Sequence, residues 1–219
     1  DIQNMLNTKT LLVLPRAENY TGPTIIMIAG NQETIQIPLT TVVKYFFMTI
    51  DMLMKIDDYA VISGFKVVCD YSPVTPSYLL QFTPTIMKYF FICLHSVYPM
   101  RMKGYIGVNV PRGIEMLYNS IVKPVLSDKI QERITIMTGI DKSQRALSDI
   151  KAMLPKEYGG GSASVMELAD QWNDEILRNK YWFLENNRYY CNEDLRQGKH
   201  QTYTEVFGME GSFRQLLID

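Results

Sequence analysis

Four basic residues flank a largely apolar segment near the middle of the chain. Arg101 and Lys103 precede this segment, and Lys129 and Arg133 follow it. Arg101 and Lys103 are two positions apart, so both side chains would leave the same face of an extended segment. Lys129 and Arg133 are four positions apart and would share one face of a helix. Such pairs suit the binding of an anion, although an ordinary solvated surface has the same spacing.

The residues that could form or break bonds lack companions at a catalytic spacing. His95 and His200 have no partners at metal-ligand spacing, and neither do the three cysteines, Cys69, Cys93 and Cys191. A cysteine–histidine couple would need a third group to orient the histidine, and the sequence indicates none. We therefore expect no enzyme activity, no metal site and no cofactor.

The composition is that of a globular protein whose charges balance. The chain has 219 residues, of which 47% are hydrophobic and 21% charged, with a net charge of −1. This balance argues against nucleic-acid binding, and the apolar runs are too short to span a membrane. The odd number of cysteines favours a reducing, cytoplasmic location. Thirteen methionines and fourteen tyrosines indicate either core filling or a pocket that adapts to a ligand.

Hydrophobic periodicity predicts strands that alternate with helices. Residues 1–20 are interpreted as a short helix, Ile2 to Leu6, followed by a loop. The expected strands are Thr24 to Ala29, Phe65 to Tyr71, Tyr105 to Val108 and Ile134 to Thr138. The expected helices begin at Pro38 and Pro84 or span Pro111 to Val122, Ser127 to Arg133 and Val165 to Leu184. This alternation predicts an α/β fold with a mainly parallel sheet flanked by helices.

Five motifs occur in a fixed order along the chain: QFTP (81–84), YPxRxKG (98–104), NxP (109–111), KPxLSDKIxER (123–133) and LPKEYGG (154–160). In this order they resemble the CRAL-TRIO lipid-binding domain family, in particular its tocopherol-transfer and clavesin-like branch. The C-terminal stretch 207–219 resembles the insect members. The resemblance implies a hydrophobic ligand pocket closed by a helical lid. The helical region that precedes the domain in the family is expected to be missing from this chain.

The same resemblance implies site residues. Apolar stripes on the helices favour a filled core by themselves, and the family pattern favours a cavity instead. The implied cavity lining comprises Phe47, Ile50, Phe65, Cys69, Tyr71, Leu80, Phe82, Phe90, Leu94 and Tyr105. The implied lid, residues 110–126, contributes Leu117, Ile121, Val122, Val125 and Leu126. Between Pro111 and Lys123 this chain is one residue longer than the family pattern, so a lid register shifted by one residue stays an alternative.

Within this pocket, Tyr71 and Tyr105 could orient a headgroup, while the apolar majority disfavours a charged phospholipid. Arg101, Lys103, Lys129 and Arg133 match family positions that bind phosphoinositide headgroups.

We therefore predict a monomeric, cytoplasmic, peripherally membrane-associated protein. It would bind and transfer a small hydrophobic lipid of tocopherol, retinoid, carotenoid or terpenoid type, guided by phosphoinositides. The alternative is a phosphoinositide-binding trafficking module that carries no ligand. The predicted domain spans residues 1–184, with an extended tail, 185–219, packed on it.

Overall fold

The computed structural model describes residues 2–136, 147–186, 188–189 and 195. The chain divides into two compact units, residues 1–178 and residues 179–219. The described part of the second unit is mainly one helix, α10 (Lys180–Asn186), in which Trp182 and Phe183 pack edge to face. Among the helices of the described ranges, none is long and apolar enough to cross a membrane.

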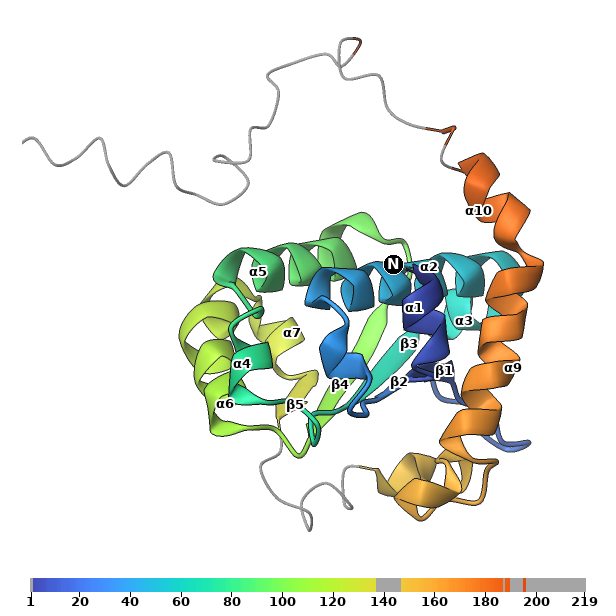
Figure 1. Cartoon of the computed structure of the whole chain (residues 1–219), viewed down its shortest axis with the longest axis horizontal. Helices are drawn as coiled ribbons and strands as arrows, with labels where there is room; N and C mark the ends of the chain where they lie inside the picture. The colour runs from blue at the N-terminus through green and yellow to red at the C-terminus, as the bar shows by residue number, and fades with distance from the viewer. Residues whose placement is uncertain (1, 137–146, 187, 190–194, 196–219) are drawn as a thin grey trace, which may run out of the picture. The chain divides into compact units, whose positions relative to one another are not determined.

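A five-stranded sheet forms the centre of the first unit (Figure 1). Its strands lie side by side in chain order: β1 (Leu11–Val13), β2 (Thr24–Ala29), β3 (Phe65–Asp70), β4 (Met102–Val108) and β5 (Ile134–Ile136). β1 pairs antiparallel with β2, and the other neighbours are parallel. The mainly parallel α/β fold is confirmed. The loop expected at residues 11–13 is wrong, because these residues form the edge strand.

Helices connect the parallel strands. β2 leads into α2 (Leu39–Ile56) and α3 (Asp58–Ser63). β3 leads into α4 (Pro76–Leu79), α5 (Pro84–Ile92) and a π-helical segment, Cys93–Val97. β4 leads into α6 (Arg112–Leu117), a second π-helical segment, Tyr118–Val122, a 3₁₀ turn, Lys123–Val125, and α7 (Asp128–Gln131). All three crossovers step the same way across the sheet. Right-handed crossovers therefore place these helices on one face.

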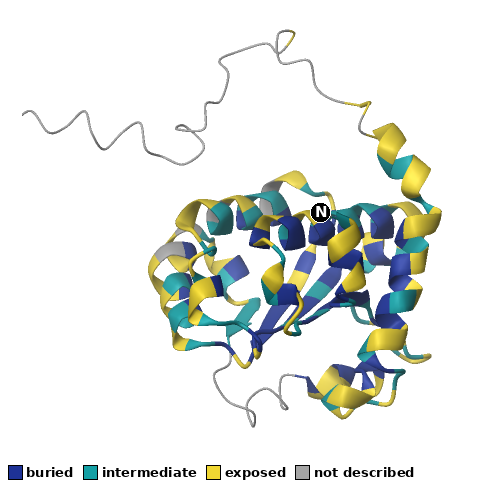
Figure 2. Ribbon diagram, viewed as in Figure 1, coloured by how far each residue is buried: buried dark blue, intermediate teal, exposed yellow. Residues whose placement is uncertain are grey.

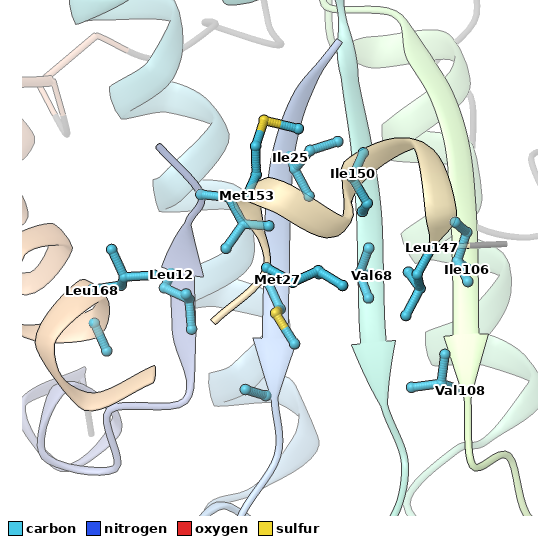
Figure 3. Close-up of a cluster of buried hydrophobic side chains, with 14 residues drawn as sticks. Leu12, Ile25, Met27, Val68, Ile106, Val108, Leu147, Ile150, Met153 and Leu168 are labelled. Atoms are coloured by element: carbon cyan, nitrogen blue, oxygen red, sulfur yellow. The ribbon is translucent and has the colours of Figure 1, made fainter. Parts of the chain in front are cut away.

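The opposite face of the sheet is covered by the later part of the chain. There the 3₁₀ helix η5 (Ser148–Met153) packs on the strands. α9 (Val165–Arg178) packs along β1, and its Leu168 and Ala169 belong to the same buried cluster. Figure 3 shows Leu12, Met27, Val68 and Ile106 from the sheet packed with Ile150 from η5, within one cluster of buried side chains. Figure 2 shows that β1 to β4 are largely buried, whereas β5 is intermediate. The side chains of the cluster in Figure 3 form a filled core.

α9 begins with a capping box, in which the Ser164 amide donates to Glu167 at 2.8 Å and the Glu167 amide donates to the Ser164 hydroxyl at 3.2 Å. The inner face of α9 forms hydrogen bonds with two other helices, α1 (Ile2–Asn7) and α2. Asn173 donates to the carbonyl of Leu6 in α1 at 2.8 Å and accepts from Tyr45 of α2 at 2.7 Å.

The helix expected to reach Leu184 ends at Arg178, where the first unit also ends. The packing predicted for the tail from residue 185 lies almost entirely outside the described residues.

Candidate functional site

A pocket of about 110 Å³ lies between the sheet and the helices on its crossover face. The strand register builds its floor. Ile28, Cys69, Gly107 and Ile136 occupy one row across β2–β5, and Tyr105 and Ile134 belong to the next row that faces the same side. Helices α2, α4, α5 and α6 supply the remaining walls. We call this the apolar pocket.

The apolar pocket is lined mainly by aliphatic and aromatic side chains. They are Ile28, Ile35, Leu39, Val42, Val43, Phe46, Pro73, Val74, Phe82, Ile86, Met87, Phe90, Phe91, Ile114, Ile134 and Ile136, together with Gly30, Thr34, Cys69, Asp70, Tyr71, Tyr78, Tyr105 and Tyr118.

The residue at which α5 begins determines which of its side chains face the pocket. The Thr83 hydroxyl accepts from the Ile86 amide at 3.3 Å, and Pro84 occupies the first helical position. Ile86, Met87, Phe90 and Phe91 then recur at helical spacing and point to the sheet side. The Phe90 ring lies 5.4 Å from that of Phe46 on α2, so the two helices meet through aromatic contacts above the pocket.

One polar cluster interrupts the apolar floor. The hydroxyls of Tyr71 and Tyr105 share a hydrogen bond, and both hydroxyls also bond to the Cys69 thiol. Burial raises the pKa of this thiol to about 12, and the two hydrogen bonds oppose that effect only in part. Burial likewise raises the pKa of both tyrosines well above 10. At neutral pH all three groups are uncharged, and the thiol is no nucleophile.

Two other polar groups on the pocket wall, those of Asp70 and Thr34, are bonded to the protein. Asp70 accepts from the Ser72 amide at 2.9 Å, from the Asn109 side chain at 2.9 Å and from the Tyr158 hydroxyl at 2.8 Å. Thr34 is bonded to Thr10. Across the described ranges, no group of three His, Cys, Asp or Glu side chains could hold a metal ion.

Five residues of the predicted lining do line the apolar pocket: Cys69, Tyr71, Phe82, Phe90 and Tyr105. Ile50 and Phe65, by contrast, are fully buried away from the pocket. The Phe65 ring lies 6.4 Å from that of Phe46, so this region is filled core.

Three further predicted lining residues also lie elsewhere. Phe47 stacks on Tyr98 with 5.1 Å between ring centroids. Leu94 lines a different hollow, described below. Leu80 is 80% exposed, because the short helix α4 turns Tyr78 toward the pocket and leaves Leu80 beyond its end.

The lid segment contacts the pocket through two residues that the sequence reasoning missed, Ile114 and Tyr118. Tyr118 follows the predicted Leu117 by one position, and Leu117 itself does not line the pocket. Val122 is buried against Phe91, and Leu126 packs on the same cluster, one layer behind the pocket wall. The side chains of the other two predicted lid residues, Ile121 and Val125, lie outside the described set.

The four basic residues line one hollow of about 420 Å³. Arg101 and Lys103 flank the first residue of β4, Lys129 lies on α7, and Arg133 follows that helix. The Arg133 guanidinium donates to the carbonyl of Met102 at 2.8 Å, which joins the two pairs. None of the four forms an ion pair with a carboxylate of the described residues. We call this the basic hollow.

Phe91 is the wall between the two sites, since it lines both the apolar pocket and the basic hollow. An apolar pocket under helices therefore lies next to a hollow lined by four cations.

Comparison with known proteins identifies the family. The model of the CRAL/TRIO domain matches residues 7–160, and the chain belongs to this family. Family members bind and transfer small hydrophobic lipids and are typically not enzymes.

Named relatives are similar to this chain over much of its length. Mouse (Mus musculus) alpha-tocopherol transfer protein-like is 27% identical over 84% of this chain and 52% of its own length. Rat (Rattus norvegicus) clavesin-1 is 28% identical over 68% of this chain and 41% of its own. The chain thus spans about half the length of the curated relatives it matches. The crystal structure of Sfh5 shares the fold, with a TM-score of 0.53 and 16% identity over 80% of this chain and 64% of that one.

Proposed function

We propose that this protein binds a small hydrophobic lipid in the apolar pocket and exchanges it at membranes whose phosphoinositide headgroups bind in the basic hollow. The observation that carries the proposal is the shared wall. Phe91 contacts both sites, so a ligand pocket and an anion site lie next to each other in one domain. The family and the relatives named for tocopherol transfer support a carrier of tocopherol-, retinoid-, carotenoid- or terpenoid-like lipid.

The size of the pocket requires its walls to move. Its volume of about 110 Å³ is below the range of roughly 300–1,000 Å³ found for ligand pockets. Two walls contain irregular helix. α5 passes into the π-helical segment Cys93–Val97, and α6 passes into Tyr118–Val122. Such π-helical turns interrupt the regular hydrogen-bond ladder and recur at functional sites. Cargo entry would displace these two helices from the sheet.

The basic hollow would direct the protein to membranes that contain phosphoinositide. Arg101, Lys103 and Lys129 are exposed, and each cation near an anionic surface contributes about 1 kcal/mol. Helix α7, which carries Lys129 of the basic hollow, is also hydrogen-bonded to the lid segment. Gln131 of α7 donates to the carbonyls of Lys123 and Leu126 at 3.1 and 2.9 Å. A headgroup that pulls on α7 would therefore act on the end of the lid and favour exchange.

The cargo is tested by purifying the protein under native conditions and measuring the mass of the intact complex, followed by organic extraction. We expect one apolar lipid per chain. If the purified chain holds no lipid and takes up none from donor vesicles, the carrier proposal fails.

In that case the second candidate would stand, a membrane-trafficking module that carries no ligand. One observation favours it, namely the small volume of the pocket.

This membrane targeting is tested with vesicles that contain phosphoinositide. Arg101→Glu with Lys129→Glu removes two cations from the basic hollow and adds two anions, which predicts a loss of at least about 2 kcal/mol, or roughly 30-fold or more in affinity. The matched control is Lys151→Glu with Lys156→Glu, two exposed cations near η5 on the opposite face of the sheet. Equal binding by the two double variants would contradict the assignment of the basic hollow.

A further inference from the structure

Two exposed aliphatic side chains lie beside the basic hollow. Ile62, near the end of α3, is 80% exposed, and Val97, the last residue of its π-helical segment, is 66% exposed. Single apolar side chains on a protein surface are common and by themselves indicate no function. These two differ in that each belongs to an anchored segment and each adjoins the cations of the hollow.

The end of α3 lies against the basic residues at the start of β4. The amide of Phe65, just after α3, donates to the carbonyl of Arg101 at 3.0 Å. Gly64 has a positive φ of 79°, and a Cβ atom there would come within 3.1 Å of the Lys103 side chain. The backbone that follows Ile62 therefore touches two of the four residues of the basic hollow.

α3 is also fixed at its start, so its end does not project by fraying. The Asp57 side chain caps the helix by accepting from the amide of Ala60 at 3.1 Å, and Ala60 is fully buried. The hydroxyl of Tyr59 donates to the carbonyl of Gly22 at 3.1 Å. Ile62 thus stays in solvent although the helix that carries it is held at several points.

Val97 is presented in a similar way. The next residue, Tyr98, lines the basic hollow, and its ring stacks on that of Phe47 in α2 with 5.1 Å between centroids. The Tyr98 hydroxyl is hydrogen-bonded to Asp51 of the same helix, and its amide donates to the carbonyl of Cys93 at 3.1 Å. Val97 therefore stands at the rim of the hollow on an anchored backbone.

The hollow and both aliphatic side chains lie at one edge of the sheet. Strands β2–β5 are parallel, so all four begin at the same edge. Ile62 precedes the start of β3, Val97 and Arg101 precede β4, and Arg133 directly precedes β5. This amino-terminal edge thus carries cations and exposed apolar groups together.

The chemistry of this edge fits a lipid bilayer. The described lining of the basic hollow contains four cations and no carboxylate. A headgroup that binds these cations stays joined to its glycerol and acyl chains, so the rim of the hollow must touch the bilayer. At such a surface cations attract anionic lipids, while neighbouring aliphatic side chains enter the boundary between headgroups and acyl chains.

We propose that Ile62 and Val97 insert into an anionic bilayer when the basic hollow binds its headgroup, so that the amino-terminal edge of the sheet faces the membrane. This inference rests on the proposed function, since it requires the hollow to bind a membrane lipid. It adds the surface that contacts the bilayer and the orientation of the domain. The cations select the membrane, and the two aliphatic side chains hold the domain on it.

The experiment measures binding to phosphatidylcholine vesicles that contain phosphatidylinositol bisphosphate and, separately, to soluble inositol trisphosphate. Ile62→Ser with Val97→Ser should lower the affinity for vesicles roughly 30-fold, the effect of keeping two partly inserted aliphatic side chains out of the bilayer. Its affinity for inositol trisphosphate should equal that of the wild type, because all four cations remain. The matched control is Met166→Ser with Leu177→Ser, which replaces two side chains of α9 that are 60% and 45% exposed. This control should keep the wild-type affinity for both probes.

Insertion itself is measured by fluorescence quenching with phospholipids whose acyl chains are brominated. Ile62→Trp should be quenched more strongly than the wild type, whose own tryptophans give the background. Met166→Trp should show only that background. This measurement depends on no loss of binding, so it decides the orientation even if the double variant does not fold.

The outcomes separate this inference from the proposed function. If the wild type binds neither probe, the assignment of the basic hollow fails and this inference with it. If Ile62→Ser with Val97→Ser binds vesicles as tightly as the wild type, or Ile62→Trp shows only background quenching, the hollow stands and insertion is refuted. A parallel loss of affinity for inositol trisphosphate would place the effect in the hollow and refute insertion. An equal loss of vesicle binding by the control variant would refute the assignment to these two residues.

Discussion

Phe91 offers a direct test of the proposed coupling between the apolar pocket and the basic hollow. Its side chain is 5% exposed and packs on Tyr118 and Val122 of the lid segment, and its ring lies 5.4 Å from that of Phe90. Phe91→Ala would remove the ring that stands between the apolar pocket and the basic hollow. Water and headgroups would then reach the pocket without displacement of a helix.

The expected cost follows from the burial of this ring. Truncating a buried phenylalanine to alanine lowers the free energy of unfolding by about 3–5 kcal/mol, against a total of roughly 5–15 kcal/mol for a domain. Phe91→Leu keeps most of the volume and should lose about 1 kcal/mol, mainly the aromatic contact with Phe90. Leu94→Ala is the matched control, since Leu94 is equally buried but lines only the basic hollow.

The assay measures the release of a fluorescent lipid to acceptor vesicles with and without phosphoinositide, beside urea unfolding of each variant. In the wild type we expect phosphoinositide to accelerate release. In Phe91→Ala, release should be fast even without phosphoinositide, so the ratio of the release rates with and without phosphoinositide should approach one. Leu94→Ala should keep the wild-type ratio. The reasoning is refuted if Phe91→Ala retains the wild-type acceleration, or if it loses less than about 1 kcal/mol of stability.

Three further outcomes are expected. Phe90→Asp should abolish lipid retention in the extraction assay, because it places an unpaired carboxylate in the apolar pocket. Leu80→Asp, at a position 80% exposed, should retain lipid in the same assay. Equal retention by the two variants would show that Phe90 faces elsewhere. Asn173→Leu leaves the Tyr45 hydroxyl and a backbone carbonyl without partners and should cost about 2–5 kcal/mol in urea unfolding, a prediction that a loss below 1 kcal/mol contradicts. Burial raises the pKa of the Cys69 thiol from 9.0 to about 12, so between pH 9 and pH 10 the unfolded chain releases this proton while the folded chain keeps it. The wild type should therefore lose about 1 kcal/mol more stability over that interval than Cys69→Ala, and equal losses would contradict the assignment.

Much of the fold could be predicted from local patterns. The β-branched run from Thr24 to Ala29 gave its strand with the observed bounds, and the Thr83–Pro84 cap gave the start of α5. β1 was missed because three residues are too few to show a period of two. The helix from Val165 was predicted too long, since the apolar rhythm continues past Arg178 although the first unit ends there.

The site was harder to predict than the fold, because facing a cavity and facing a core leave the same pattern in a sequence. Phe65 and Cys69 share one face of β3, yet Phe65 packs into filled core while Cys69 lines the pocket. Only the positions of the neighbouring helices separate these two outcomes. The directions of the Leu80 and Tyr118 side chains depend on where the short helices α4 and α6 end. A shift of one residue moves a side chain about 100° around a helix.

The contrast between the two faces of the sheet has a consequence for how the domain opens. The face covered by η5 is packed by one large cluster of buried side chains, whereas the face under α4–α6 encloses the apolar pocket. Movement of α5 and α6 would leave the packed face intact, so cargo exchange would require a sub-global opening and no complete unfolding. Amide hydrogens of α5 and α6 should then exchange with solvent far sooner than those of β2, β3 and α9, which form the slow-exchanging unit of the domain.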